Sequence, residues 1–154
     1  MIEFIQVESK EQLRFVRELF DEYVESLGFE LDFQDYRKEF DELPGEFAPS
    51  EGRLVLVLVD GQSAGCVGLR RMDDAVCEMK RMYVRPDFRG RGIGRGMAEL
   101  LIEEARKIGY KTMRLDTIDS TREAISLYRS LGFREITPYR FNPMEGAKFF
   151  ELAL

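Results

Sequence analysis

The sequence predicts a single α/β (α+β) domain over residues 1–154, with a mixed, mostly antiparallel central sheet of about seven strands and about four helices. Three observations predict this class. A chain of 154 residues is long enough for one domain with a full hydrophobic core. Its 44% hydrophobic and 34% charged residues are typical of a soluble globular protein. Short apolar strands alternate with amphipathic helices that begin at capping residues and end at glycines.

The composition argues against several functional classes. A net charge of −6 and a pI near 4.9 disfavour a nucleic-acid-binding surface. The absence of histidine excludes Ser-His and Cys-His nucleophilic sites and most zinc sites, so we expect no metal. No apolar run approaches the length of a membrane span, and no signal peptide is recognisable at Met1. We therefore expect a cytoplasmic protein that binds neither nucleic acid nor membrane.

The first half of the chain predicts a strand, two helices and a three-stranded meander. Residues 2–7 alternate as a strand does, and a capping box at Ser9 opens an amphipathic helix that ends at Gly28. The following segments are a short helix and three strands: Phe33–Leu43, Arg53–Val59, Gln62–Arg70 and Val76–Val84. Aromatic residues of the short helix fit core packing, or alternatively the wall of an acceptor pocket. A two-residue turn at Asp73-Asp74 would place Cys66 opposite Arg81 and away from Cys77, and we expect both cysteines to be reduced.

The fourth strand has a parity conflict that predicts a β-bulge. Met79, Met82 and Val84 all have the character of core residues, yet a regular strand cannot point all three to one face. One extra residue near Lys80-Arg81 resolves the conflict. Such a bulge also twists the strand away from its neighbour and leaves backbone groups available to a ligand.

The second half predicts two more helices and three more strands. The helix Ile93–Ile108 ends at Gly109, and a capping box at Ser120 opens another that ends at Gly132. The remaining segments are strands: Lys111–Asp116, Phe133–Ile136 and Ala147–Leu154. The first of these should run parallel to Val76–Val84, because a crossover helix connects them.

A basic, glycine-rich stretch at Glu78–Gly94 leads from the fourth strand into the next helix. Gly90, Gly92 and Gly94 permit close approach of a ligand to the backbone, and the following helix N-terminus favours an anion. Six basic residues crowd into this part of an acidic chain: Lys80, Arg81, Arg85, Arg89, Arg91 and Arg95. The stretch matches neither a P-loop nor a dinucleotide fingerprint. It predicts a site for a phosphate or pyrophosphate.

Two motifs resemble those of the GCN5-related N-acetyltransferase (GNAT) family. Arg89-Gly90-Arg91-Gly92-Ile93-Gly94 resembles its acyl-CoA-binding pattern, and the block from Ala124 to Phe133 resembles its second recurrent block. The order of elements is similar to the acyl-CoA N-acyltransferase fold along the whole chain. An asparagine that often precedes the second block is Thr121 here. The tail from Pro138 to Ala147 resembles an uncharacterised bacterial-type subgroup of the family, which names no substrate.

The resemblance implies transfer of an acetyl group from acetyl-CoA to an amine by direct attack. It implies that the pyrophosphate binds to backbone groups of Arg89, Gly90, Arg91, Gly92, Ile93 and Gly94, with Thr121 contributing polar contacts. It also implies that main-chain groups of Met82, Tyr83 and Val84 hold the pantetheine arm, with an N–H near the bulge as oxyanion donor. Tyr128 is the implied acid for the CoA thiolate. Its other interpretation is a core tyrosine.

A lysine-like acceptor amine of pKa about 10.4 is almost entirely protonated at pH 7, so a base is needed. Glu78 is the candidate, directly or through water, with an ion pair to Lys80 or Arg70 as its alternative role. The acceptor itself stays open among protein lysine, polyamine, aminoglycoside and small metabolite. Acidic residues favour a cationic amine, whereas Arg70, Arg71 and Arg140 could bind a carboxylate. The alternative function is an acyl-CoA-binding sensor without turnover, and a homodimer through the last strands is compatible with either.

Overall fold

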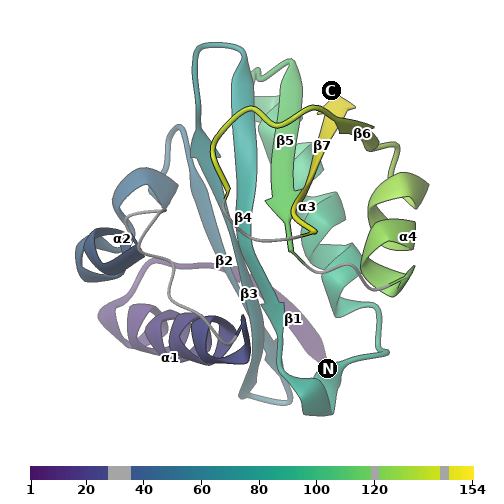
Figure 1. Ribbon diagram of the computed structural model, residues 1–154. Coiled ribbons are helices and arrows are strands. Elements are labelled where there is room, and N and C mark those ends of the chain that lie inside the picture. The colour runs from purple at the N-terminus through teal and green to yellow at the C-terminus, as the bar shows by residue number, and fades with distance from the viewer. Residues whose placement is uncertain (28–35, 119–121, 143–145) are drawn as a thin grey trace.

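The structure is a computed structural model that describes residues 1–27, 36–118, 122–142 and 146–154. Within these residues, seven strands form one mixed sheet in the order β1-β2-β3-β4-β5-β7-β6 (Figure 1). The strands are β1 (Ile2–Gln6), β2 (Arg53–Val59), β3 (Gln62–Arg71), β4 (Val76–Val84), β5 (Thr112–Thr117), β6 (Arg134–Ile136) and β7 (Lys148–Ala153). The α-helices of the described residues are α1 (Lys10–Leu27), α2 (Tyr36–Glu42), α3 (Ile93–Ile108) and α4 (Arg122–Ser130). The predicted fold class is confirmed.

Helices cover both faces of the sheet. Helices α1 and α2 lie on one face and α3 and α4 on the other (Figure 1). Phe20 and Phe47 are fully buried on the first face, where their rings meet edge-to-face at 6.4 Å. Met97 and Leu101 of α3 are fully buried on the second face. No helix in the described ranges is both long and apolar enough to span a bilayer.

Strands β1 to β4 form an antiparallel meander, and β5 joins β4 in parallel as the crossover helix α3 requires. The final strand, β7, inserts between β5 and β6 and is antiparallel to both. This insertion leaves the short β6 at the edge of the sheet. Residues 137–142, which lead toward β7, pass across β5 and β4 in Figure 1.

The predicted bulge in β4 is present. The pairing of β3 with β4 shifts between Cys66, which lies opposite Tyr83, and Gly68, which lies opposite Lys80. Arg81 occupies the extra position, with a φ of 60° in the left-handed region. The shift brings Met82 onto the same core cluster as Met79, which resolves the parity conflict in the sequence.

The predicted register of Cys66 was wrong, because Cys66 lies opposite Tyr83 and not Arg81. One residue of the difference comes from the bulge and one from a longer turn. The Asp73 carboxylate accepts hydrogen bonds from the N–H groups of Ala75 and Val76, each at 2.8 Å, and so stabilises the longer turn. Both cysteines are free and buried, as predicted, and burial raises the pKa of each thiol.

Candidate active site

A groove opens where β4 and β5 separate. Their parallel pairing covers only Val76–Glu78 against Thr112–Arg114, and beyond that the two strands diverge (Figure 1). A cavity of about 950 Å³ lies between the two strands. Met79–Val84 line one wall of the cavity and 115–118 line the other. The divergence leaves the edge of β4 without a strand partner in the described residues, so its main chain can pair with an extended ligand.

The glycine turn forms one end of this cavity. Gly90 and Gly92 have φ values of 80° and 78°, which a residue with a side chain adopts only with strain. Gly92 is the N-cap of α3 and, as a glycine, has no side chain to cap the helix. The Gly96 N–H donates to the Gly92 carbonyl at 3.0 Å. The N–H groups of the first turn of α3 therefore lack carbonyl partners within the helix. This arrangement suits a phosphate.

The structure brings most of the predicted pyrophosphate residues to the cavity wall, but not all. Arg89, Gly90, Gly92, Ile93 and Gly94 line the cavity. The Arg89 N–H already bonds the Pro86 carbonyl at 3.3 Å, which leaves the N–H groups after it as the better donors. The Arg91 guanidinium lies 5.3 Å from the Phe88 ring centroid, and Arg91 is not one of the lining residues. Thr121 lies outside the described residues.

The predicted pantetheine and acid residues also line the cavity. Met82, Tyr83 and Val84 contribute the stretch of β4 that follows the bulge. Tyr128 of α4 is 8% exposed, and its ring packs against the ring of Phe150 at 5.8 Å. Its burial fits both roles that the sequence allows, so its role as the acid stays a prediction.

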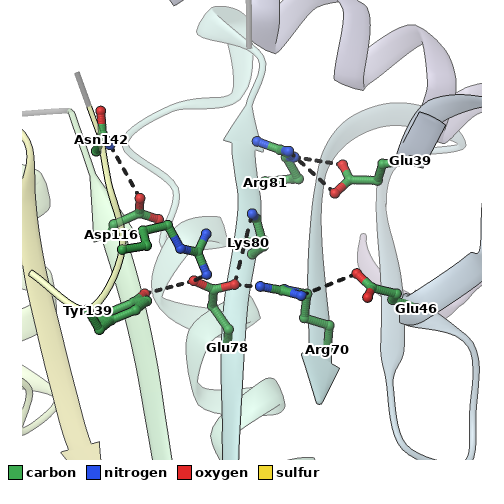
Figure 2. Close-up of polar contacts among 10 residues, drawn as sticks. Glu39, Glu46, Arg70, Glu78, Lys80, Arg81, Asp116, Tyr139 and Asn142 are labelled. Atoms are coloured by element: carbon green, nitrogen blue, oxygen red, sulfur yellow. Dashed lines mark hydrogen bonds and ion pairs between the residues drawn. The ribbon is translucent and has the colours of Figure 1, made fainter. Parts of the chain in front are cut away.

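Glu78 of β4 is fully buried, and Figure 2 shows the polar groups around it. Its Oε1 accepts a hydrogen bond from Arg70 Nε at 2.7 Å, and its Oε2 accepts one from the Tyr139 hydroxyl at 2.7 Å. Arg140 forms an ion pair with the same Oε2. Burial alone would raise the pKa of Glu78, but the charges of Lys80, Arg140 and Arg70 hold it below its usual value.

These contacts bear on the proposed role of Glu78 as a base. The ion pairs considered as its alternative role are present, and Glu78 is not one of the residues that line the cavity. A carboxylate with a lowered pKa holds a proton weakly. The catalytic role therefore stays a prediction, and it would require water or another group between Glu78 and the acceptor.

Sequence reasoning gave no acceptor-binding role to three polar residues of the cavity, although it named Lys80 in the basic stretch and as an ion-pair partner of Glu78. Lys80 lines the cavity from β4, Asp116 lines it from β5, and Asn142 lines it from the loop before β7. Asn142 Nδ2 donates a hydrogen bond to Asp116 Oδ2 at 3.3 Å (Figure 2). The alternation of β4 could have identified Lys80, since it points to the same face as Glu78. No sequence signal connects Asn142 with Asp116.

In the part of the chain that the structure describes, the aromatic wall considered for the acceptor pocket is not found at this cavity. The aromatic residues considered for the acceptor pocket fall partly outside the described residues, and Tyr36, Phe40 and Phe47 do not line the cavity. They pack around α2 and α1 as core residues. Within the described ranges, no cluster of three or more histidine, cysteine, aspartate or glutamate side chains could hold a metal ion.

Comparisons with known proteins identify the family of the chain. The model of the acetyltransferase (GNAT) family matches residues 14–133. An uncharacterized N-acetyltransferase of Schizosaccharomyces pombe is 35% identical over 139 residues, which cover 88% of this chain and 85% of that protein. An uncharacterized N-acetyltransferase of Dictyostelium discoideum is 31% identical over 198 residues, which cover 89% of this chain and 92% of that protein.

Solved structures share the fold along the whole chain. The acetyltransferase from Streptococcus agalactiae has a TM-score of 0.80 at 21% identity, with 99% of this chain and 98% of that chain covered. The PaiA N-acetyltransferase from Thermoplasma acidophilum, solved in complex with coenzyme A, has a TM-score of 0.75 at 16% identity, with coverage of 100% and 99%. Because the family model spans most of the sequence and two relatives exceed 30% identity over nearly nine-tenths of it, the chain belongs to the acetyltransferase (GNAT) family and is an acetyl-CoA-dependent N-acetyltransferase.

Proposed function

We propose that the protein transfers an acetyl group from acetyl-CoA directly to a primary amine. The observation that carries the proposal is the divergence of β4 from β5 beyond Glu78. It produces one continuous cavity that joins the glycine turn at Gly92 to polar groups at Lys80 and Asp116. One end suits the pyrophosphate and the other an acceptor, so the thioester would lie between them, beside the bulge.

The positions of the binding residues along the cavity support the roles proposed for them. The N–H groups of residues 90–94 hold the pyrophosphate, and main-chain groups of Met82, Tyr83 and Val84 hold the pantetheine arm. The N–H of Met82 is the donor that we assign to the thioester carbonyl. Acetyl-CoA supplies the activated acetyl group, and a carbonyl held by a backbone N–H is stabilised most when negative charge develops on its oxygen.

Two residues would move protons. The Tyr128 hydroxyl would protonate the departing thiolate, and in the first of two roles Glu78 would take the proton of the amine through water. The competing role for Glu78 is positioning: its carboxylate fixes Arg70, Lys80 and Arg140 without touching the acceptor. The Glu78→Gln variant separates these roles by its kinetic profile.

Relatives with named acceptors support an amine. The [ribosomal protein bS18]-alanine N-acetyltransferase of Escherichia coli is 46% identical over 54 residues, which cover 35% of this chain and 36% of that protein. The N-acetylaspartate synthetase of Danio rerio is 37% identical over 82 residues, which cover 53% of this chain and 29% of that protein. Both names describe acylation at nitrogen, one on a protein and one on an amino acid.

The decisive experiment measures CoA release from acetyl-CoA with a panel of amines: polyamines, lysine peptides, aminoglycosides, amino acids and amino-acid amides. The proposal expects amine-dependent release. Tight binding of CoA together with an absence of release across the panel would favour the alternative, a sensor that binds acyl-CoA without turnover.

The Tyr128→Phe variant tests the assigned acid. Loss of the hydroxyl should lower kcat by about 10- to 100-fold, because general acid catalysis typically contributes at least that much, while CoA affinity is retained. The matched control is Tyr110→Phe. The Tyr110 hydroxyl donates to the Glu51 carbonyl at 2.7 Å, outside the cavity, so its loss should leave kcat unchanged. Equal turnover rates for the two variants would assign Tyr128 to the core instead.

A further inference from the structure

Lys80 is a buried cation that faces the cavity without a hydrogen bond from the described part of the protein. It is 8% exposed and lines the cavity from β4. Among the described residues, Glu78 alone lies within ion-pair range of its ammonium group, with Nζ 3.9 Å from Oε1. That distance is too long for a hydrogen bond. A buried ammonium group is costly unless it is paired and hydrogen-bonded.

The carboxylate beside Lys80, that of Glu78, already binds other groups. Arg70 and Tyr139 bind the two oxygens of Glu78, and Arg140 pairs with the same group. Three cations therefore share one buried carboxylate, and Lys80 makes the longest of the contacts. The next cation on β4, Arg81, has its own partner in Glu39, with Nε 2.7 Å from Oε2 (Figure 2). The ammonium group of Lys80, which lines the cavity, is therefore only weakly neutralised by Glu78.

The opposite wall of the cavity carries a negative group. Asp116 lines the cavity from β5, across from Lys80, and is oriented by its hydrogen bond from Asn142 (Figure 2). A ligand with one cationic and one anionic group complements these two walls. Lys80 and Met82, the proposed carbonyl donor, lie two positions apart on either side of the bulge residue Arg81. Two residues span at most about 7 Å, so the two positions lie within the length of one small molecule.

We infer that the acceptor is an amine that also carries a carboxylate, of the amino-acid type, and that Lys80 binds this carboxylate. The inference rests on the proposed amine acetylation and specifies its substrate class. Lys80 acts here as a determinant of specificity, and its ammonium group gains from the ligand the hydrogen-bond acceptor that the described residues do not provide.

The electrostatics of Lys80 fit this role. Burial lowers the pKa of Lys80 to about 8, with Arg81 and Arg140 adding to the effect and Glu78 and Glu39 opposing it. The charged form is therefore destabilised in the folded protein, yet most molecules still carry it at pH 7. A bound carboxylate would offset that cost.

The test compares acceptors that differ only in the carboxylate. Initial rates of CoA release are measured with L-alanine, L-leucine, L-lysine and L-glutamate, each against its α-carboxamide. The amides have less basic amines and a larger neutral fraction, so chemistry alone favours them. We expect kcat/KM to favour at least one free acid over its amide by 10-fold or more. A second arm uses tripeptides with free and with amidated C-termini, which distinguishes a free amino acid from a peptide as the source of the carboxylate.

The Lys80→Met variant assigns the preference to this side chain. It should lower kcat/KM for the acids by 10-fold or more, chiefly through KM, and leave the amides within about twofold. Lys107→Met is the control, because Lys107 is exposed on α3 and lies outside the cavity. Without any ligand, Lys80→Met should also raise Tm by about 3 °C or more, since it removes a buried charge.

Failure of the inference and failure of the proposed function give different results. Release of CoA that is indifferent to the carboxylate, or equal losses for acids and amides in Lys80→Met, would overturn the inference and leave amine acetylation standing. A lowered Tm in Lys80→Met would overturn it as well. Absence of release from the wild-type protein with every acceptor, amides included, would reject the proposed function itself.

Discussion

At the scale of single residues, the glycine turn and the buried charges differ in how far the sequence reveals them. Gly90 and Gly92 are recognisable because the requirement is local: each has a positive φ beside a helix N-terminus. The environment of Glu78 is not local. Tyr139, which donates to its carboxylate, is separated from it by 61 positions. The sequence could therefore nominate Glu78, but it could not show that the carboxylate is enclosed.

Gly92→Ala tests the turn directly. A Cβ at this position would meet no atom within 4 Å, so the expected loss of stability is the strain of a left-handed alanine, about 1–2 kcal/mol. The variant should also weaken CoA binding by 10-fold or more, because a methyl group at this position would stand where the pyrophosphate approaches the backbone. Urea unfolding measures the first effect and isothermal titration with CoA the second.

Gly109 supplies the matched control, since it lies at the opposite end of α3 with a φ of 110° and equally open space. Gly109→Ala should lose a similar amount of stability and keep its CoA affinity. An unchanged CoA affinity in Gly92→Ala would remove the turn from the pyrophosphate site.

At the scale of elements, hydrophobic alternation was enough to predict the bulge in β4 but not its register against β3. Met79 and Met82 cannot share a face of a regular strand, which predicted an extra residue near Lys80-Arg81, and the structure places it at Arg81. The opposing register depends on the length of the preceding turn. That length is stabilised by the Asp73 carboxylate through its bonds to the following N–H groups, a side-chain effect that alternation does not report.

The bulge predicts an inverted order of stability for small residues at position 81. In a regular strand, alanine is more stable than glycine by about 0.5–1 kcal/mol. At a φ of 60°, Arg81→Gly should instead be more stable than Arg81→Ala by about 1 kcal/mol. Both variants lose the ion pair with Glu39, so that loss cancels in the comparison. Denaturant unfolding of the two variants measures the difference.

Lys148 of β7 has an ordinary strand conformation and provides the reference pair. There the alanine variant should be the more stable one. The same order at position 81 as at position 148 would show that Arg81 carries no left-handed strain in solution.

At the scale of the whole molecule, the order of elements was predictable and the enclosure of the site was not. The helices and strands have local periodicities or caps, so the order of the elements along the chain could be predicted from the amino-acid sequence. The position of β7 between β5 and β6 depends on pairing between distant segments. That position carries the preceding loop, with Tyr139 and Arg140, over Glu78. The network around Glu78 thus joins β3, β4 and this loop, and it couples the site to the stability of the fold.

Glu78→Gln tests that coupling. It leaves the three surrounding cations without their shared negative charge, and we expect a loss of about 3–5 kcal/mol in the free energy of unfolding at pH 7. The folded pKa of Glu78 is lowered, so its contribution is present above the unfolded pKa of about 4.3 and is lost as the pH falls through the folded value. The stability difference between wild type and variant should therefore shrink below about pH 4.

The control for this loss is Glu46→Gln, which removes the exposed second partner of Arg70 at 3.3 Å. An exposed ion pair contributes little, so this variant should lose less than about 1 kcal/mol. Urea unfolding at pH 7 and at a series of pH values below 4 measures both variants. A difference for Glu78→Gln that stays constant down to the lowest pH would contradict the lowered pKa.

The Glu78→Gln variant also decides between the two roles of Glu78 in catalysis, provided that its rates are measured at a temperature where it stays folded. If Glu78 is the base, the acidic limb of the profile of kcat/KM against pH should disappear in Glu78→Gln, and turnover should slow by about 100-fold or more. If Glu78 only positions Lys80, Arg70 and Arg140, the limb should remain and KM for the acceptor should rise instead. The lowered pKa and the enclosure of the carboxylate favour the second outcome, because a carboxylate that three cations stabilise has little affinity for the proton of an amine.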